Sequence, residues 1–159
     1  MIQEGYDHTQ YGKIHFLLQI PAVICLVASY FLLERSTSAT MILISVGIIL
    51  LLFSFTVIWL RVHDLGEHIK CTFGPIKLLS KKTAYCDIAE AYVSRSKLID
   101  GWGIHKVAGR GWTYNIWGYD CVEFKLTNGN LMRIGTDDPA NLASFIQSKL
   151  NSPVNNTAD

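Results

Sequence analysis

The chain has 159 residues, and its 14 basic and 13 acidic side chains give a formal net charge of +1 at pH 7. This near balance gives no global indication of nucleic-acid binding. Only 17% of the residues are charged, against about 25% in a typical soluble protein. The deficit lies at the N-terminal end, which argues against an ordinary soluble domain there.

Two long segments without a charge, residues 16–33 and 41–60, dominate the N-terminal part. At a rise of about 1.5 Å per residue, each is long enough as a helix to cross a bilayer core of about 30 Å. Buried core helices are the alternative, but too little chain remains to cover two of them. A cleaved signal peptide is the alternative for the first segment, but Glu4 and Asp7 precede it and a second apolar segment follows. We predict two membrane-spanning helices.

The short connector, residues 34–40, predicts that the two helices form an antiparallel hairpin. Ala22, Cys25 and Ser29 fall on one face of the first helix. Small side chains at these positions would let the second helix approach closely.

The distribution of lysine and arginine predicts the orientation of this hairpin. The connector contains only Arg35, whereas five basic residues follow the second span. Since basic residues stay in the cytoplasm, we expect both termini to be cytoplasmic. The same five residues are candidate membrane-surface contacts, each adding about 1 kcal/mol near anionic headgroups, with solvated charges that bind no ligand as the alternative. They are Arg61, Lys70, Lys77, Lys81 and Lys82.

Past the second span, the apolar pattern changes from continuous to alternating. In residues 67–73, the side chains of Ile69, Cys71 and Phe73 share one side of an extended chain, which predicts a strand. Gly74-Pro75 indicates a turn. We expect further strands at residues 76–79, 91–96, 103–107 and 112–116.

A hairpin is expected around Asn128-Gly129. A two-residue turn would bring Arg133 to the apolar face of the preceding strand, where burying it unpaired would cost several kcal/mol. A three-residue loop, residues 128–130, instead leaves Glu123 diagonal to Arg133 on the outside. We therefore predict the three-residue loop. It aligns one apolar face made of Val122, Phe124, Leu126, Met132 and Ile134.

A single helix is predicted at residues 139–150, after the hairpin. Asp138 can cap it, and Pro139 suits its first position. Its apolar residues recur at helical spacing, so this helix should close one end of a small sheet. They are Leu142, Phe145, Ile146 and Leu150.

Residues 101–124 contain five glycines and three tryptophans. Glycine permits sharp corners and bulges, and tryptophan needs a large apolar surface, so the combination predicts a strongly curved sheet. We interpret Trp102, Trp112 and Trp117 as packing residues, with an exposed ligand platform as the alternative.

Three motifs in this part of the chain, at residues 101–104, 111–115 and 134–139, read Gly-Trp-Gly-Ile, Gly-Trp-Thr-Tyr-Asn and Ile-Gly-Thr-Asp-Asp-Pro. Nearly the whole chain resembles bacterial membrane-anchored proteins that carry two N-terminal spans followed by a pleckstrin-homology-like (PH-like) domain. The resemblance implies a seven-stranded, partly open β-barrel closed by one C-terminal helix. It implies little about activity, because this fold hosts many binding roles.

The expected fold class is therefore a two-helix transmembrane hairpin followed by an all-β PH-like domain with a C-terminal helix. We expect four parts along the chain. They are an N-terminal cytoplasmic segment at 1–13, the hairpin at 14–62, the PH-like domain at 63–151, and a disordered tail at 152–159.

Motifs for chemistry are weak in this sequence. His63 and His68 are five residues apart, a spacing that turns them away from each other on a helix and does not fit a zinc motif. Asp137 and Asp138 resemble a carboxylate pair but suit a helix start better. No Gly-x-Ser-x-Gly or phosphate-loop motif is present in the sequence. We expect no catalysis, no metal and no cofactor, and free thiols at Cys25, Cys71, Cys86 and Cys121.

These features together predict a non-catalytic interaction module held at the cytoplasmic face of a bacterial inner membrane. We expect a protein or peptide partner, bound through an exposed strand edge, and no nucleic acid. Two alternatives remain open: sensing of anionic lipid headgroups, and a role as accessory subunit of a larger membrane complex.

Overall fold

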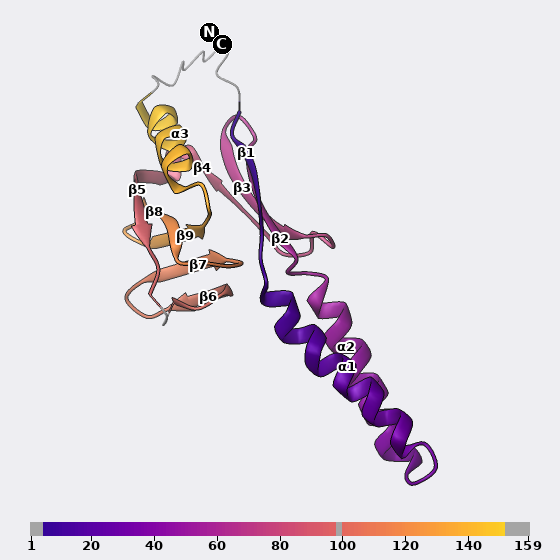
Figure 1. Ribbon diagram of the computed structural model, residues 1–159. Coiled ribbons are helices and arrows are strands. Elements are labelled where there is room, and N and C mark those ends of the chain that lie inside the picture. Colours follow the sequence, from indigo (N-terminus) through magenta and orange to yellow (C-terminus); the bar gives the residue numbers. More distant parts are fainter. Residues whose placement is uncertain (1–4, 98–99, 152–159) are drawn as a thin grey trace, which may run out of the picture.

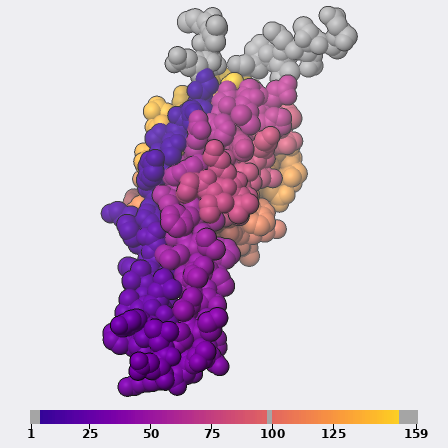
Figure 2. Space-filling model, turned by 90° about the vertical axis from the view of Figure 1, so that its right-hand side faces the viewer, coloured from indigo at the N-terminus to yellow at the C-terminus, as the bar shows by residue number. Residues whose placement is uncertain are grey.

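The computed structural model describes residues 5–97 and 100–151, so the tail predicted at residues 152–159 lies outside the described residues. A helical hairpin projects from one end of a β-rich domain (Figure 1). In Figure 2 the hairpin forms a narrow stalk, and the strands that follow it in sequence cover the face of the domain toward the viewer.

The two predicted helices are present as α1 (Ile14–Leu32) and α2 (Thr37–Ser54). Both are long and apolar enough to cross a membrane, with mean hydropathies of 1.9 and 2.2. In the most apolar 18-residue stretch of each helix, only 11% of α1 and 17% of α2 is buried. A core helix of a soluble protein would be mostly buried, so these helices expose an apolar surface that the domain does not cover.

Small residues form the contact between α1 and α2. Ala22 and Ser29 are buried on α1, and Cys25 between them is half-buried, as the predicted contact face requires. A Cβ atom on Gly47 of α2 would lie 3.2 Å from the carbonyl oxygen of Ala22. The buried residues of α2 recur at every seventh position, which keeps them on one face: Thr40, Gly47 and Ser54.

The hairpin grows directly out of two neighbouring strands. β1 (Asp7–Tyr11) precedes α1, and β2 (Trp59–Asp64) follows α2. They pair antiparallel along their whole length, from Asp7 opposite His63 to Tyr11 opposite Trp59. Both ends of the hairpin therefore enter the same sheet.

Neither β1 nor β2 was predicted from the sequence. The second span was expected to end at residue 60, but Leu60 is buried in the domain core as part of β2. Leu60 is apolar because it packs in the core of the domain, but in the sequence it directly continues the apolar segment of the second span. Likewise, the predicted division at residue 63 leaves β1 and most of β2 outside the domain to whose first sheet they belong.

The first sheet has the strand order β1-β2-β3-β4, with β3 (His68–Gly74) and β4 (Ser80–Ala84). β3 confirms the strand predicted at 67–73, and its three alternating apolar side chains are buried on one face. The strand predicted at 76–79 is wrong. This segment is part of the turn between β3 and β4, where Lys77 has a φ of 56°, outside the range of an extended strand.

A second sheet has the order β5-β8-β9-β7-β6, and β7 runs parallel to β9. A short 3₁₀ helix, η1 (Tyr85–Asp87), carries the chain from β4 into it. Among the described residues the two sheets contain nine strands and are not closed into a barrel, where a seven-stranded, partly open barrel was expected. The strands are β5 (Ile88–Arg95), β6 (Gly103–Val107), β7 (Gly111–Asn115), β8 (Asp120–Leu126) and β9 (Leu131–Gly135).

The hairpin of β8 and β9 has a three-residue loop, but it lies at residues 127–129 and not at the predicted 128–130, because Lys125 pairs with Leu131 and the backbone N–H of Leu126 donates to the oxygen of Asn130. The predicted register is wrong by two residues, a shift that leaves the faces of the side chains unchanged. Val122 pairs with Ile134, so the apolar residues of both strands share one face.

The expected positions of Glu123 and Arg133 are wrong, because the two lie directly opposite each other and only 6% and 4% of their surfaces are exposed. Their ion pair lowers the cost of burial. The prediction considered only an unpaired Arg133 on the buried face.

The helix α3 (Pro139–Asn151) begins at the predicted residue and covers one side of the second sheet. Asp64, at the end of β2, ties it to the first sheet. An oxygen of Asp64 lies 3.0 Å from Nζ of Lys149, and the hydroxyl of Tyr85 donates to the same carboxylate at 2.6 Å. Burial raises the pKa of Asp64, but these contacts and a hydrogen bond from the backbone of Gly66 outweigh it and hold the pKa below its ordinary value.

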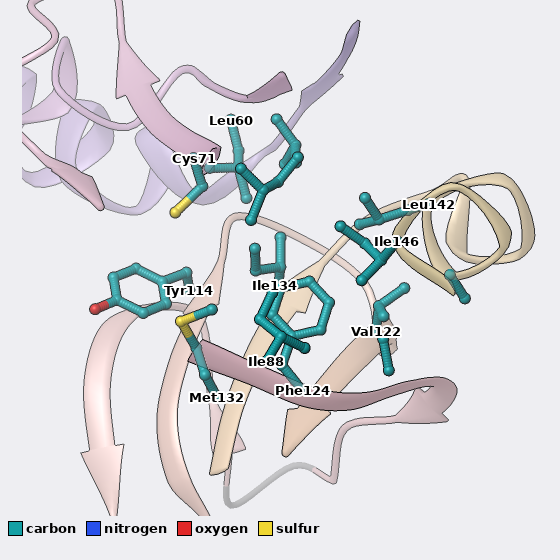
Figure 3. Packing of buried hydrophobic residues seen from close by; sticks show 14 of the residues in the cluster. Leu60, Cys71, Ile88, Tyr114, Val122, Phe124, Met132, Ile134, Leu142 and Ile146 are labelled. Carbon is teal, nitrogen blue, oxygen red and sulfur yellow. The ribbon is translucent and has the colours of Figure 1, made fainter. Parts of the chain in front are cut away.

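The apolar core lies between the facing sides of the two sheets. Figure 3 shows Leu60 and Cys71 from the first sheet pointing toward Ile134 of the second. Leu142 and Ile146 of α3 close the core on one side and are fully buried.

One close backbone contact holds β7 against β9. Gly111, at the start of β7, has a φ of 81°, and a Cβ atom there would lie 1.9 Å from the carbonyl oxygen of Leu131. Gly109 has a similar φ of 69° but nothing within 4 Å of such an atom.

We therefore expect Gly109→Ala to cost about 1–2 kcal/mol, the strain of a positive φ alone. Gly111→Ala should cost more, on the order of 3–5 kcal/mol, because it adds a backbone clash. Thermal unfolding of the two variants in mild detergent checks this. Equal losses would show that the contact between β7 and β9 is not tight.

Candidate functional site

A groove of about 370 Å³ opens between the two sheets, where β4 faces β6, β7 and β9. In Figure 3, Tyr114 lies at the end of the core opposite Leu142 of α3. The groove is thus on the side of the domain that α3 does not close. Its lining includes Lys81, Lys106, Trp112, Tyr114, Leu131 and Met132.

Lys81 reaches the groove because of the register of β4. It pairs with Cys71, whose side chain is buried in the core, so the two side chains share the inner face of the first sheet. Lys81 is nevertheless exposed, since it lies at the open mouth. Its neighbour Lys82 points to the opposite face.

The other wall comes from β6 and β7. Lys106 lies opposite Trp112 in this antiparallel pair, so both side chains are on the same face. Trp112 is 45% exposed, and its ring is stacked beside that of Tyr114, with centroids 6.4 Å apart. Trp112 is thus only partly a packing residue, and the alternative of an exposed platform describes it better.

The groove is electropositive. Among the residues described, its lining includes two lysines and no aspartate or glutamate. Burial raises the pKa of Tyr114 above its ordinary value, so its hydroxyl stays protonated at neutral pH and can donate a hydrogen bond. An anionic group with apolar neighbours would find complementary partners here.

A free strand edge borders the groove. β4 pairs only with β3 among the described strands. The backbone N–H of Phe73 donates to the carbonyl oxygen of Leu79, and the N–H of Tyr85 donates to the carbonyl oxygen of Glu67. In an antiparallel pair every second residue bonds to the partner strand, so the odd-numbered residues of β4 face β3. The backbone groups of the even-numbered residues therefore point away from β3, and those residues are Ser80, Lys82 and Ala84.

A network of four charges lies on the other face of the second sheet. Asp100 is fully buried and accepts two hydrogen bonds of 2.6 Å from Arg110. Arg133 pairs with Glu123, donates to the backbone oxygen of Arg110 at 2.6 Å, and lies 3.9 Å from Asp100. Tyr92 also donates to Glu123.

This network is neutral, with two acids and two bases. Burial raises the pKa of Asp100, but the hydrogen bonds from Arg110 and from the backbone of Lys97 outweigh it and lower the pKa below its ordinary value. Each charge has an opposite charge beside it, and Nε of Arg133 is the one buried polar atom of these four side chains without a hydrogen-bond partner among the described residues. We assign the network to stability and not to ligand binding.

The structure separates the five predicted membrane-surface residues. Arg61, Lys70 and Lys82 lie on the outer face of the first sheet, and Lys77 lies in the turn beyond β3. Lys81 belongs to the groove instead. Arg61 is paired with Asp7 of β1, so its charge is largely neutralised.

The remaining tryptophans of the glycine-rich stretch pack together. Trp102 and Trp117 stack with centroids 4.6 Å apart, and the indole of Trp102 donates to the backbone of Gly118. This arrangement agrees with the packing role expected for both.

Sequence reasoning missed Lys106 and Tyr114 as groove residues. The alternation of Trp112 and Tyr114 in one strand was the available signal, but it does not say which sheet lies opposite. The sheet that lies opposite is set by β4, and this strand was expected at residues 76–79 and not at Ser80–Ala84.

Within residues 5–97 and 100–151, no group of three or more His, Cys, Asp or Glu side chains is arranged to hold a metal ion. His63 lies in β2 with its pKa lowered by burial and by the nearby Arg61. No family model matches the chain, and no curated protein matches it.

The buried network makes a testable prediction. Arg133→Met should cost about 3–5 kcal/mol, because it leaves the buried Glu123 without its cation, whereas Asp100 keeps Arg110. Lys125→Met is the matched control on the adjacent strand: its ion pair with Glu90 is exposed, so its loss should cost about 1 kcal/mol or less. Thermal unfolding in detergent compares the two, and similar small shifts would contradict the structural role.

Proposed function

We propose that this protein is a non-catalytic interaction module, anchored by two transmembrane helices at the cytoplasmic face of a bacterial inner membrane, that binds an extended peptide of a protein partner. The groove between the sheets carries this proposal. It combines Lys81 and Lys106, which have no ion-pair partner among the described residues, with the exposed ring of Trp112.

The dimensions of the helices support membrane anchoring. The 19 residues of α1 and the 18 residues of α2 correspond to lengths of about 28 and 27 Å, close to the bilayer core of about 30 Å. Pairing of β1 with β2 keeps both flanks of the hairpin on one side. The cytoplasmic assignment follows from the basic residues on that side, Lys13, Arg61 and Lys77, against Arg35 alone in the connector.

The arrangement of the domain supports a PH-like origin in outline. Two facing sheets and one C-terminal helix are present. We propose a variant of that fold in which the sheets remain separate along β4, which leaves the groove open.

The chemistry of the groove favours an acidic peptide with apolar side chains. The lysines would pair with its carboxylates, and Trp112 and Leu131 offer an apolar surface. The unpaired backbone of β4 can form main-chain hydrogen bonds with an added strand. The same residues offer no nucleophile activated by a base, which favours binding over catalysis.

Sensing of anionic lipid headgroups is the second candidate. Its support is the proximity of Arg61 and Lys77, which line one open hollow near the helices. The pairing of Arg61 with Asp7 weakens it. A role as accessory subunit would use the same groove to hold another membrane protein.

The test is selection of a displayed library of random peptides against the full chain in lipid nanodiscs. We expect selected peptides to be enriched in Asp, Glu and apolar residues. Lys81→Glu should weaken their binding roughly tenfold or more, since a charged contact becomes a repulsion. Lys82→Glu is the control, because it makes the same change on the next residue of β4 but on the opposite face.

Equal effects of the two substitutions would indicate nonspecific charge attraction and would refute the groove. Lipid sensing would be favoured by two results together. No peptide would be selected, and the wild-type chain in nanodiscs would be retained on added vesicles in proportion to their content of anionic lipid.

A further inference from the structure

We infer that the turn between β3 and β4 is a third membrane contact, which dips into the bilayer interface beside the two helices. We call residues 75–79 the apolar turn. This inference rests on the proposed membrane anchoring and adds a contact that fixes the orientation of the domain.

The apolar turn exposes three large apolar side chains. Ile76 is 45% exposed, Leu78 is 77% exposed and Leu79 is 40% exposed. None of them belongs to the core cluster of the domain. Three such side chains within four residues are unusual on a surface that faces only water.

The apolar turn begins next to the helical hairpin. Gly74, the last residue of β3, pairs with Trp59, the first residue of β2. The backbone of Ile58 donates to the oxygen of Gly74 at 2.9 Å. The chain leaves α2 at Ser54, only a few residues earlier, so this end of the sheet is the end nearest the helices (Figure 1).

Trp59 holds the start of the apolar turn in place. A Cβ atom on Gly74 would lie 2.0 Å from Cζ2 of Trp59, so the indole ring packs directly on the backbone at this point. The turn is therefore fixed relative to β2, and through β2 to α2.

The surroundings have the composition of a membrane interface. Tyr11 at the end of β1 is 71% exposed, and Phe55 at the end of α2 is 44% exposed. Tyr11, Trp59 and Lys77 line one open hollow of about 370 Å³. Aromatic rings at the level of headgroups, with lysines whose alkyl chains extend to them, are typical of this zone.

The occupant that fits is a phospholipid bilayer, because the exposed apolar side chains lie at the end of the sheet from which the two apolar helices leave. Leu78 and Leu79 would enter the acyl boundary, and Lys77 would remain among the headgroups. The domain would then be held by α1, α2 and the apolar turn, three contacts that restrict its tilt. The groove would keep a fixed orientation to the membrane surface.

The test uses the full chain in proteoliposomes with single cysteines labelled by an environment-sensitive fluorophore. Leu78→Cys reports on the apolar turn. Leu65→Cys is the matched control, because Leu65 is 47% exposed in the turn at the opposite end of β2 and β3. Val27→Cys, exposed on α1, reports on the span itself. The accessible native Cys25 and Cys86 are replaced by serine in all three.

Lipids that carry a quencher on their acyl chains are then added. We expect quenching at positions 27 and 78 and little at position 65. Quenching at position 27, with position 78 no more quenched than position 65, would overturn the apolar turn and leave the anchoring intact. Absence of quenching at position 27 would overturn the anchoring and the inference together. A blue-shifted label at position 78 without lipid quenching would indicate a protein contact and would also overturn it.

Discussion

Five residue pairs join β1 to β2, and the position of every other strand of the first sheet relative to the helices depends on them. Because β1 leads into α1 and β2 follows α2, the helical hairpin is an extension of the sheet and not a tethered anchor. A flexible linker would leave the domain free to rotate. Here the ladder of backbone hydrogen bonds transmits the orientation of the helices to the sheet.

This geometry decides which charges can lie near a membrane surface. Strand residues advance about 3.3 Å each, so Arg61 lies about 7 Å beyond Trp59, and Lys70 lies in a row about 13 Å beyond it. Surface electrostatics decay over a Debye length of about 8–10 Å. The lysines of the outer sheet face are thus poorly placed to bind headgroups, whereas Lys77 is well placed. Lys81, on the inner face, contributes to a different surface.

The sequence predicted the features that depend on local pattern. The two apolar helices, the shared apolar face of β8 and β9 and the start of the last helix at Pro139 follow from hydrophobic pattern and capping preferences. The register of β8 and β9 was wrong by two residues, because shifts of two leave the same side chains on the apolar face. β1 was not predictable in this way, because its five residues carry no apolar alternation and form a strand only through pairing with β2. The burial of Arg133 likewise depends on its ion pair with Glu123, which the predicted register did not place directly opposite, and the groove depends on how two sheets face each other.

The most direct measurement is a disulfide cross-link between β1 and β2 in the full chain in lipid. Thr9 and Arg61 form a pair without mutual backbone hydrogen bonds, whose Cα atoms should lie about 4.5 Å apart, within the range for a disulfide. We predict that Thr9→Cys with Arg61→Cys cross-links readily under mild oxidation. Thr9→Cys with Thr72→Cys, one strand further on, should not. Equal cross-linking of both pairs, or none of the first, would contradict a hairpin built into the sheet.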